Sequence, residues 1–207
     1  MARDILSDPE KTALVAAVKN VEQRSSAEVV IAFRGCSGRY LDADLIAGSL
    51  LAFLTLWFQL FTPWEFSLPV ILGSPVLAGA LGALLSSLSP AVRRLLTSSA
   101  SRRERVRLGA LAAFHDMRVS ETRERTGVLV YVSLLERAAA VVPDTGVRRQ
   151  VPREAWDTAA RAIETAAAGA SPALPVAETV RGLGGVLAPA LPRREDDVNE
   201  LPDEVGR

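Results

Sequence analysis

The chain has 207 residues, of which 49% are apolar and 5% aromatic, and its 24 basic and 24 acidic side chains cancel at neutral pH. The single cysteine, Cys36, excludes an intramolecular disulfide, and the single histidine, His115, excludes a zinc site of the common Cys/His-rich type. Residues 45–92 contain one ionisable group, Glu65, so the apolar excess is concentrated in one block. This segregation indicates one globular domain with an added apolar segment, not a uniform soluble globule.

The N-terminal region predicts a helix followed by a strand. It is acidic and lacks the basic and apolar segments of a secretory signal, so we expect it to stay in the cytoplasm. Ser7 and Glu10 have the spacing of an N-cap and the acidic residue that closes a capping box. Residues 28–33 are mostly apolar and β-branched, which predicts a strand covered on both faces. Residues 35–44, rich in Gly, Ser and Asp, then lead into the apolar block.

The apolar block predicts a hairpin of two transmembrane helices, at about residues 45–64 and 68–90. The first uncharged run has 20 residues, enough at about 1.5 Å per residue to span a hydrocarbon core of roughly 30 Å. Small residues four positions apart are expected to let the two backbones approach: Gly48 and Ala52, and Ala78 and Gly82. The alternative is a helical hairpin buried in a soluble core, although such helices usually keep a charged face.

The distribution of arginines predicts the orientation of this hairpin. The turn, residues 62–67, has no Lys or Arg, and its Trp64 is expected to lie at the headgroup level. Arginines flank the hairpin on the other side: Arg34, Arg39, Arg93, Arg94, Arg102, Arg103, Arg105 and Arg107. The positive-inside rule therefore predicts a protein of the cell (inner) membrane with both termini in the cytoplasm. We expect the arginines after the hairpin to attract anionic lipid; the alternative is a solvated helix face.

The sequence after the hairpin completes an α/β pattern. Residues 102–117 predict a helix that returns to the sheet, and residues 128–133 predict a second strand. Residues 138–142 predict a third strand antiparallel to the second, which a Pro-Asp-Thr-Gly segment at 143–146 interrupts. Further helices are expected from Pro152 and over residues 176–191. This order of elements predicts an α/β sandwich.

The flanks of the hairpin are expected to form one split domain. Because the helix after the hairpin must pack on the sheet, residues 1–44 and 93–192 belong together, with the hairpin at 45–92 inserted between them. Residues 193–207 form an acidic tail without core-forming residues, which predicts disorder. The tail has two further interpretations, a docking peptide for a partner or a segment that folds back on the arginines of its own domain.

Three segments carry a family resemblance. These are residues 27–32 (AEVVIA), residues 114–133, and residues 142–147 (VPDTGV). They look like the TPM domain, named for thylakoid lumen, photosystem assembly and modulator proteins, and the tail at 196–203 resembles a bacterial subgroup with a hairpin inside the domain. The resemblance implies a Rossmann-like three-layer α/β/α fold. It also implies a role in assembly or repair of membrane complexes, acid phosphatase activity, or binding of divalent cations, as described for different members.

Asp144 is the first candidate for site chemistry. It follows the third strand, at a strand end where open α/β sheets often place sites, and matches an acidic position of the TPM family. With Glu28 or Glu136 it could ligate a hard cation such as Ca²⁺ or Mg²⁺, which takes six or more oxygens. The sequence does not supply that number. The alternative is an Asp that stabilises a turn by accepting backbone N–H bonds.

Arg125 and His115 are the other candidate catalytic residues. Arg125 lies in a cationic, hydroxyl-bearing segment that could hold a phosphate or carboxylate, and the alternative is an ion pair with Glu136 or another acidic residue. His115 could act as a general base or phosphoryl acceptor, and the alternative is pairing with a nearby carboxylate. Neither Ser133 nor Cys36 has a visible base, and no loop or module for nucleotide or nucleic acid occurs.

The sequence therefore supports two functional hypotheses. The first is a membrane-anchored interaction module that assists the assembly or quality control of a membrane complex, with the lipid bilayer and an integral membrane protein as partners. The second is a divalent-metal-assisted phosphatase acting on phosphomonoesters, with Asp144 as ligand or acid/base and Arg125 holding the phosphate.

Overall fold

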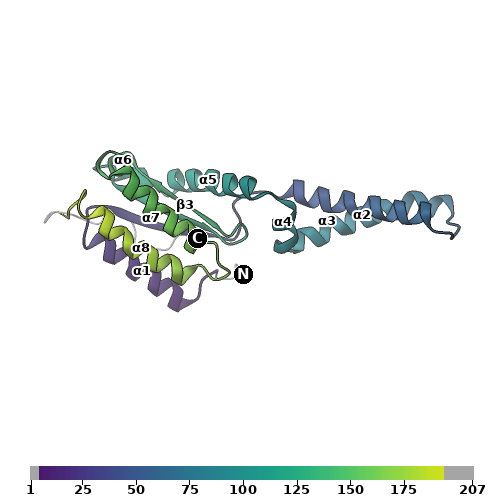
Figure 1. Ribbon diagram of the computed structural model, residues 1–207, viewed down its shortest axis with the longest axis horizontal. Helices are drawn as coiled ribbons and strands as arrows, with labels where there is room; N and C mark the ends of the chain where they lie inside the picture. The colour runs from purple at the N-terminus through teal and green to yellow at the C-terminus, as the bar shows by residue number, and fades with distance from the viewer. Residues whose placement is uncertain (1–4, 194–207) are drawn as a thin grey trace. The chain divides into compact units, whose positions relative to one another are not determined.

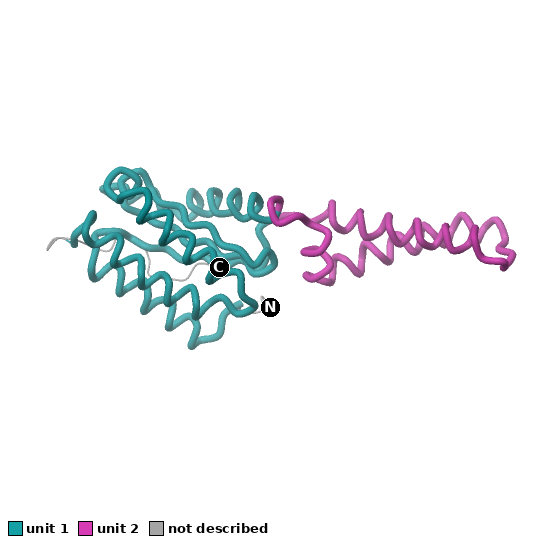
Figure 2. The backbone as a smooth tube through the Cα atoms, viewed as in Figure 1, with its two compact units in different colours: residues 1–37, 102–207 teal, residues 38–101 magenta. Residues whose placement is uncertain are grey.

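The computed structural model describes residues 5–193, and the chain divides into two compact units. One unit contains residues 1–37 and 102–207, and the other contains residues 38–101 (Figure 2). The first unit is an α/β domain and the second consists of helices. The mixed α/β class expected from the sequence is confirmed. The acidic tail, apart from Arg193, lies outside the described residues.

A three-stranded mixed sheet forms the centre of the α/β domain. Its order is β1-β2-β3, with bounds Glu28–Arg34, Gly127–Ser133 and Ala138–Pro143. β1 and β2 are parallel, with Glu28 opposite Gly127, and β2 and β3 are antiparallel, with Val128 opposite Pro143. The carboxyl end of β3 therefore lies at the same edge of the sheet as the amino ends of β1 and β2. The three predicted strands and the antiparallel third strand are confirmed.

Helices cover both faces of this sheet (Figure 1). On one face lie α1 (Asp8–Glu22), α8 (Ala173–Leu187) and α7 (Arg153–Ala166), with α1 next to β1 and α7 next to β3. On the other face lie α5 (Ser99–Asp116) and the short 3-10 helix η1 (Val119–Glu121). A short helix, α6 (Thr145–Gln150), follows β3 directly. Two apolar cores result, one on each face.

Alternation along the strands explains the two cores. Val29, Ile31 and Phe33 face α1 and α8, whereas Val30 and Ala32 face α5. The first six residues of β1 and all seven of β2 are buried, as expected for strands covered on both faces. At Glu10 the predicted capping box is present, because its carboxylate accepts hydrogen bonds from the backbone N–H and hydroxyl of Ser7 at 2.8 and 2.7 Å.

The helical unit contains two long helices and one short helix. The long helices, α2 (Leu41–Phe61) and α3 (Leu68–Leu88), form a hairpin, and the short helix α4 (Pro90–Leu96) follows after Ser89. α2 begins four residues before the expected Leu45, because acidic side chains in its first turn interact favourably with the helix dipole. It ends at Phe61, since Pro63 cannot continue it.

Two short helices were not predicted from the sequence. α4 begins at Pro90, whose fixed φ suits a first helical position, so the residue expected to end a helix starts another one. α6 begins directly after Asp144, which the sequence placed in a break. In addition, α8 begins at Ala173 and ends at Leu187, rather than covering residues 176–191, because Pro175 is tolerated in a first turn.

Candidate functional site

The surface of the hairpin is the most unusual feature of the described residues. α2 and α3 each have 21 residues and are long and apolar enough to cross a membrane by length and composition. Their large side chains point away from the hairpin: Phe61 and Leu77 are each 73% exposed, and Leu72 is 65% exposed. An apolar surface of this extent marks a membrane or protein interaction site.

Glycines bring α2 and α3 into close contact. A Cβ atom on Gly48 would lie 2.7 Å from the carbonyl oxygen of Gly79, and one on Gly82 would lie 2.9 Å from the carbonyl oxygen of Ala47. Larger residues at these positions would therefore separate the helices. Of the small residues expected to form this contact, Gly48, Ala52 and Gly82 do so, whereas Gly79 takes the place foreseen for Ala78.

Polar side chains also join the two helices within the apolar segment. The amide nitrogen of Gln59 donates to the hydroxyl of Ser74, and that hydroxyl donates in turn to the carbonyl oxygen of Val70 at 2.8 Å. Gln59 is only 9% exposed although its neighbours on α2 face outward. The amide nitrogen, which would be costly in hydrocarbon, is thus paired inside the hairpin, whereas Oε1 of Gln59 is buried without a hydrogen bond from the described residues.

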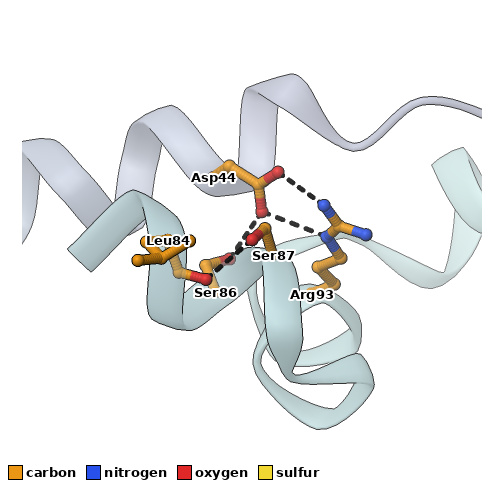
Figure 3. A network of polar contacts seen from close by, with 5 residues as sticks. All are labelled: Asp44, Leu84, Ser86, Ser87 and Arg93. Carbon is orange, nitrogen blue, oxygen red and sulfur yellow. Dashed lines mark hydrogen bonds and ion pairs between the residues drawn. The ribbon is translucent and has the colours of Figure 1, made fainter. Parts of the chain in front are cut away.

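An ion pair closes the base of the hairpin (Figure 3). Arg93 of α4 donates from Nη2 to Oδ2 of Asp44 at 2.7 Å and from Nε to Oδ1 at 3.1 Å. The Ser86 hydroxyl of α3 donates to Oδ1 of Asp44 at 2.8 Å, and the Arg93 guanidinium lies 6.0 Å from the ring centroid of Tyr40. We call Tyr40, Asp44, Ser86 and Arg93 the clasp. It connects α2, α3 and α4 by a bidentate geometry that only Arg supplies.

Sequence reasoning missed the clasp. It assigned Asp44 to a linker and Arg93 to a cluster of arginines attracted to lipid. The available signal was an acidic side chain directly before the uncharged run, close to flanks rich in arginine, and it does not single out Arg93 as the partner. In the structure the side chains of Asp44 and Arg93 are 12% and 23% exposed, so Arg93 is engaged within the unit.

Asp144 and Glu28 lie at the amino edge of β1 and β2. The backbone N–H of Asp144 donates to the carbonyl of Gly127, which is opposite Glu28. Asp144 Oδ1 accepts the N–H of Thr145 at 2.6 Å, and Oδ2 is buried and accepts no hydrogen bond from the described residues. Asp144 is therefore the N-cap of α6, in agreement with the turn-stabilising alternative.

Glu136 lies at the opposite edge of the sheet. It is 3% exposed, accepts the backbone N–H of Ser37 at 3.0 Å and the hydroxyl of Ser133, and has the Cys36 thiol at 3.8 Å. Seven strand residues put about 20 Å between the two edges. Glu136 therefore cannot share a cation with Asp144 and Glu28, and it instead secures the loop after β1.

The described residues do not assemble the predicted metal site. They contain no group of three or more His, Cys, Asp or Glu side chains that could hold a metal ion. Asp144 and Glu28 provide at most two carboxylates at one edge, whereas Ca²⁺ and Mg²⁺ take about six to eight oxygens. The set of Asp144, Glu28 and Glu136 thus does not fit one divalent cation.

Arg125 and His115 are both exposed and belong to different parts of the domain. Arg125 has a positive φ of 57°, and its carbonyl accepts the N–H of Gly146, which places it beside Asp144 at the amino edge. The alternative pairing of Arg125 with Glu136 is wrong, because the length of β2 separates them. His115 lies in the last turn of α5, where positively charged side chains interact favourably with the helix dipole.

Comparisons with known proteins bear on the fold only. No family model matches the chain, and no curated protein matches it. Among solved structures, the NMR structure of the BA42 protein from the psychrophilic bacterium Bizionia argentinensis is similar, with a TM-score of 0.59 and 17% sequence identity. The likeness covers 100% of this chain and 97% of that chain. At this level of identity, it indicates a shared fold.

Proposed function

We propose that this chain is an integral protein of the cell membrane and acts there as an interaction module for the assembly or quality control of a membrane complex. In this proposal α2 and α3 cross the bilayer as a hairpin, and the α/β domain is a Rossmann-like, three-layer TPM domain in the cytoplasm. The observation that carries it is the outward-facing apolar surface of both long helices, because a soluble protein would leave this surface in water.

The energetics of insertion support a hairpin that spans the membrane. Each Leu, Ile, Val or Phe near the centre of a membrane helix contributes about −0.3 to −0.6 kcal/mol to insertion. The carboxylate of Asp44 is paired with Arg93, and the amide nitrogen of Gln59 is paired with Ser74. The hairpin therefore keeps its favourable lipid contacts without exposing unpaired charge.

The charge distribution supports a cytoplasmic domain. Both flanks of the hairpin carry arginines, whereas the turn between α2 and α3 has none and contains Trp64, which is 67% exposed. The positive-inside rule then places both flanks in the cytoplasm and the turn on the other side.

An interaction role is favoured over catalysis because the candidate catalytic and metal-binding residues do not all meet at one place. Asp144 and Arg125 lie at one edge of the sheet and Glu136 at the other, and His115 is on α5. Crosslinking in native membranes tests the role, and it should recover one reproducible integral membrane partner. The control is the same α/β domain attached to a hairpin of scrambled sequence. If this control is crosslinked to the same proteins as the natural chain, the proposed role is contradicted.

One observation keeps the phosphatase as a second candidate. Asp144 Oδ2 is buried without a hydrogen bond from the described residues, which is unusual for a carboxylate that only caps a helix. If Asp144 serves catalysis, the purified full chain in detergent should hydrolyse a generic phosphomonoester with added Mg²⁺, and Asp144→Asn should remove this activity. Turnover that is unchanged in Asp144→Asn would reject the second candidate.

A further inference from the structure

The short helix α4 leaves one apolar face exposed. Leu95 is 85% exposed, and no large apolar side chain among residues 5–193 has a greater exposed fraction. Ala91, one turn earlier on the same face, is also exposed. The opposite side of the helix carries Arg93, which points toward Asp44 of α2 (Figure 3). We call Ala91 and Leu95 the outer face of α4, and it contains no charged residue.

α4 is fixed to the end of the hairpin at which α2 begins and α3 ends. Only Ser89 separates α4 from α3, and its extended backbone, with φ −114° and ψ 103°, turns the chain away from the axis of α3. The Ser89 hydroxyl accepts the N–H of Val92 at 3.4 Å and thereby caps α4. Arg93 binds α2 through both oxygens of Asp44. The clasp and this short connection therefore hold the outer face of α4 at the base of the hairpin.

The length of α3 relates α4 to the boundary of a membrane. α3 has 21 residues. At about 1.5 Å per residue they extend over about 32 Å, close to the roughly 30 Å of a hydrocarbon core. A hairpin that spans the bilayer therefore reaches its surface near Leu88, and α4 begins two residues later at Pro90. Arg93 and Arg94 are the first charged side chains after Glu65. In a spanning hairpin, α4 thus lies at the depth where acyl chains meet headgroups.

The apolar surface of the hairpin continues to this end. Leu88, the last residue of α3, is 72% exposed, and Leu85 one turn earlier is exposed as well. On α2, Leu41 and Leu45 in the first two turns are also exposed. Acyl chains that cover these side chains in a spanning hairpin are therefore present at the same end as Leu95. Lipid can cover Leu95 by continuity with this surface, without a separate partner.

The arrangement of charge round α4 is that of a helix lying in a membrane surface. Successive residues are about 100° apart round a helix, so Arg94 lies about 100° from Leu95. A long arginine side chain at that position can reach headgroup phosphates while Leu95 faces the acyl chains. Arg102 and Arg103 follow in the sequence, so the flank of α4 is cationic and suits an anionic leaflet.

We propose that α4 is an interfacial helix, whose outer face of Ala91 and Leu95 is buried at the boundary between acyl chains and headgroups of the cytoplasmic leaflet, with Arg94 at the phosphates. The clasp then holds this helix and the base of the hairpin at one depth in the bilayer. This inference rests on the proposed function, because α4 reaches that depth only if α2 and α3 span the membrane.

Depth-dependent fluorescence quenching of the full chain in vesicles tests the proposal. Leu95→Cys in a Cys36→Ser background carries a single environment-sensitive fluorophore, and the vesicles contain phosphatidylcholine, phosphatidylglycerol and a lipid with a nitroxide near the headgroup end of its acyl chain. The control is Leu174→Cys in the same background, at an exposed apolar position on α8 of the α/β domain. Quenching at position 95 should be at least about threefold that at position 174, because a buried outer face brings the label to the nitroxide. Equal quenching at the two positions would overturn the proposal.

A comparison of labels on different sides of α4 gives a second test. A label at Ala91→Cys should be quenched as strongly as one at Leu95→Cys, and at least about twofold more than one at Arg94→Cys, which lies toward the headgroups. Equal quenching at all three positions would contradict a fixed outer face. Quenching at position 95 that rises as the chain is diluted with lipid would identify a second copy as the cover of this face, which also overturns the proposal.

A label in the middle of α3 separates this inference from the proposed function. Leu77→Cys, at an exposed position of α3, should be quenched by a nitroxide near the end of the acyl chain if the hairpin spans the bilayer. Such quenching at position 77, without shallow quenching at position 95, would overturn the interfacial helix and leave the hairpin in place. An absence of quenching at both positions would contradict the spanning hairpin, and the interfacial helix with it.

Discussion

The two units of this chain differ in the exposure of their apolar side chains. In the α/β domain, Leu14 and Phe33 are 0% and 1% exposed, whereas Leu77 of the hairpin is 73% exposed. A sheet covered by helices on both faces encloses its apolar side chains, but two helices can cover only the narrow strip where Gly48 and Gly82 bring them together. The domain thus encloses its large apolar side chains, whereas the hairpin leaves most of its own exposed.

Equivalent truncations of an apolar side chain in the two units should give the largest difference in stability. Phe33→Ala removes a fully buried side chain and should lower the free energy of unfolding of the domain by about 3–5 kcal/mol, measured by exchange of the β2 amides in detergent. Leu77→Ala removes a side chain of a residue that is 73% exposed, and should change the protection of α3 amides by less than about 0.5 kcal/mol. Similar losses for both would mean that the hairpin surface is covered by protein.

The buried carboxylate of Glu136 should have the next largest effect. Glu136→Ala leaves the backbone N–H of Ser37 and the hydroxyl of Ser133 without their acceptor, at about 1–3 kcal/mol for each orphaned group. The stability of the domain to urea is the measurement. Glu121→Ala is the control, because its ion pair with Arg118 is exposed and should contribute less than about 1 kcal/mol. Equal losses in the two variants would show that Glu136 is not a structural acceptor.

Substitutions in the clasp test whether polar contacts within the hairpin unit stabilise its structure. A double-mutant cycle of Asp44→Ala and Arg93→Ala should give a coupling free energy of about 1–3 kcal/mol, because the pair is bidentate and mostly buried. The readout is amide exchange in α4, which Arg93 holds against α2. Additive single effects would indicate that the two side chains do not act together.

The capping box of α1 should give the smallest effect and a pH dependence. Hydrogen bonds from the Ser7 hydroxyl, and then from its backbone N–H, lower the pKa of the Glu10 carboxyl below its ordinary value of 4.5. The ionised carboxylate therefore stabilises the fold above about pH 4.5, and this contribution is lost as the pH falls through the lowered pKa. Ser7→Ala should cost about 1 kcal/mol at neutral pH. Urea unfolding of the wild type and of Glu10→Gln should converge at low pH, and a constant difference would contradict the assignment.

The elements that follow hydrophobic pattern were predictable from the sequence. Residues 28–33 and 128–133 were predicted as strands because their mostly apolar, β-branched runs are typical of strands buried on both faces. Residues 138–142 were predicted as a third strand because they follow the second strand closely. The hairpin followed from an uncharged run of sufficient length. The short helices α4 and α6 could not be found in this way, because they have no apolar periodicity and depend on Pro90 and Asp144 at their starts.

The candidate site was less predictable because it depends on pairs distant in sequence. Asp144 was expected at a strand end suited to a site, but β3 runs antiparallel, so its end meets the amino edge of the parallel pair rather than the carboxyl edge. Glu136 was grouped with Asp144 although β2 separates them. The clasp joins residues 49 positions apart, and nothing in the local pattern of Asp44 or Arg93 indicates the partner.

The accessibility of single cysteines tests the central claim, a hairpin that crosses the membrane from the cytoplasm. Cys36 is the only cysteine and is exposed on the α/β domain, and Glu65→Cys in a Cys36→Ser background places the only thiol in the turn. A membrane-impermeant thiol reagent should label the turn cysteine in intact cells, and should label Cys36 only after the cells are opened. Labelling of Cys36 in intact cells, or protection of the turn until lysis, would contradict the account.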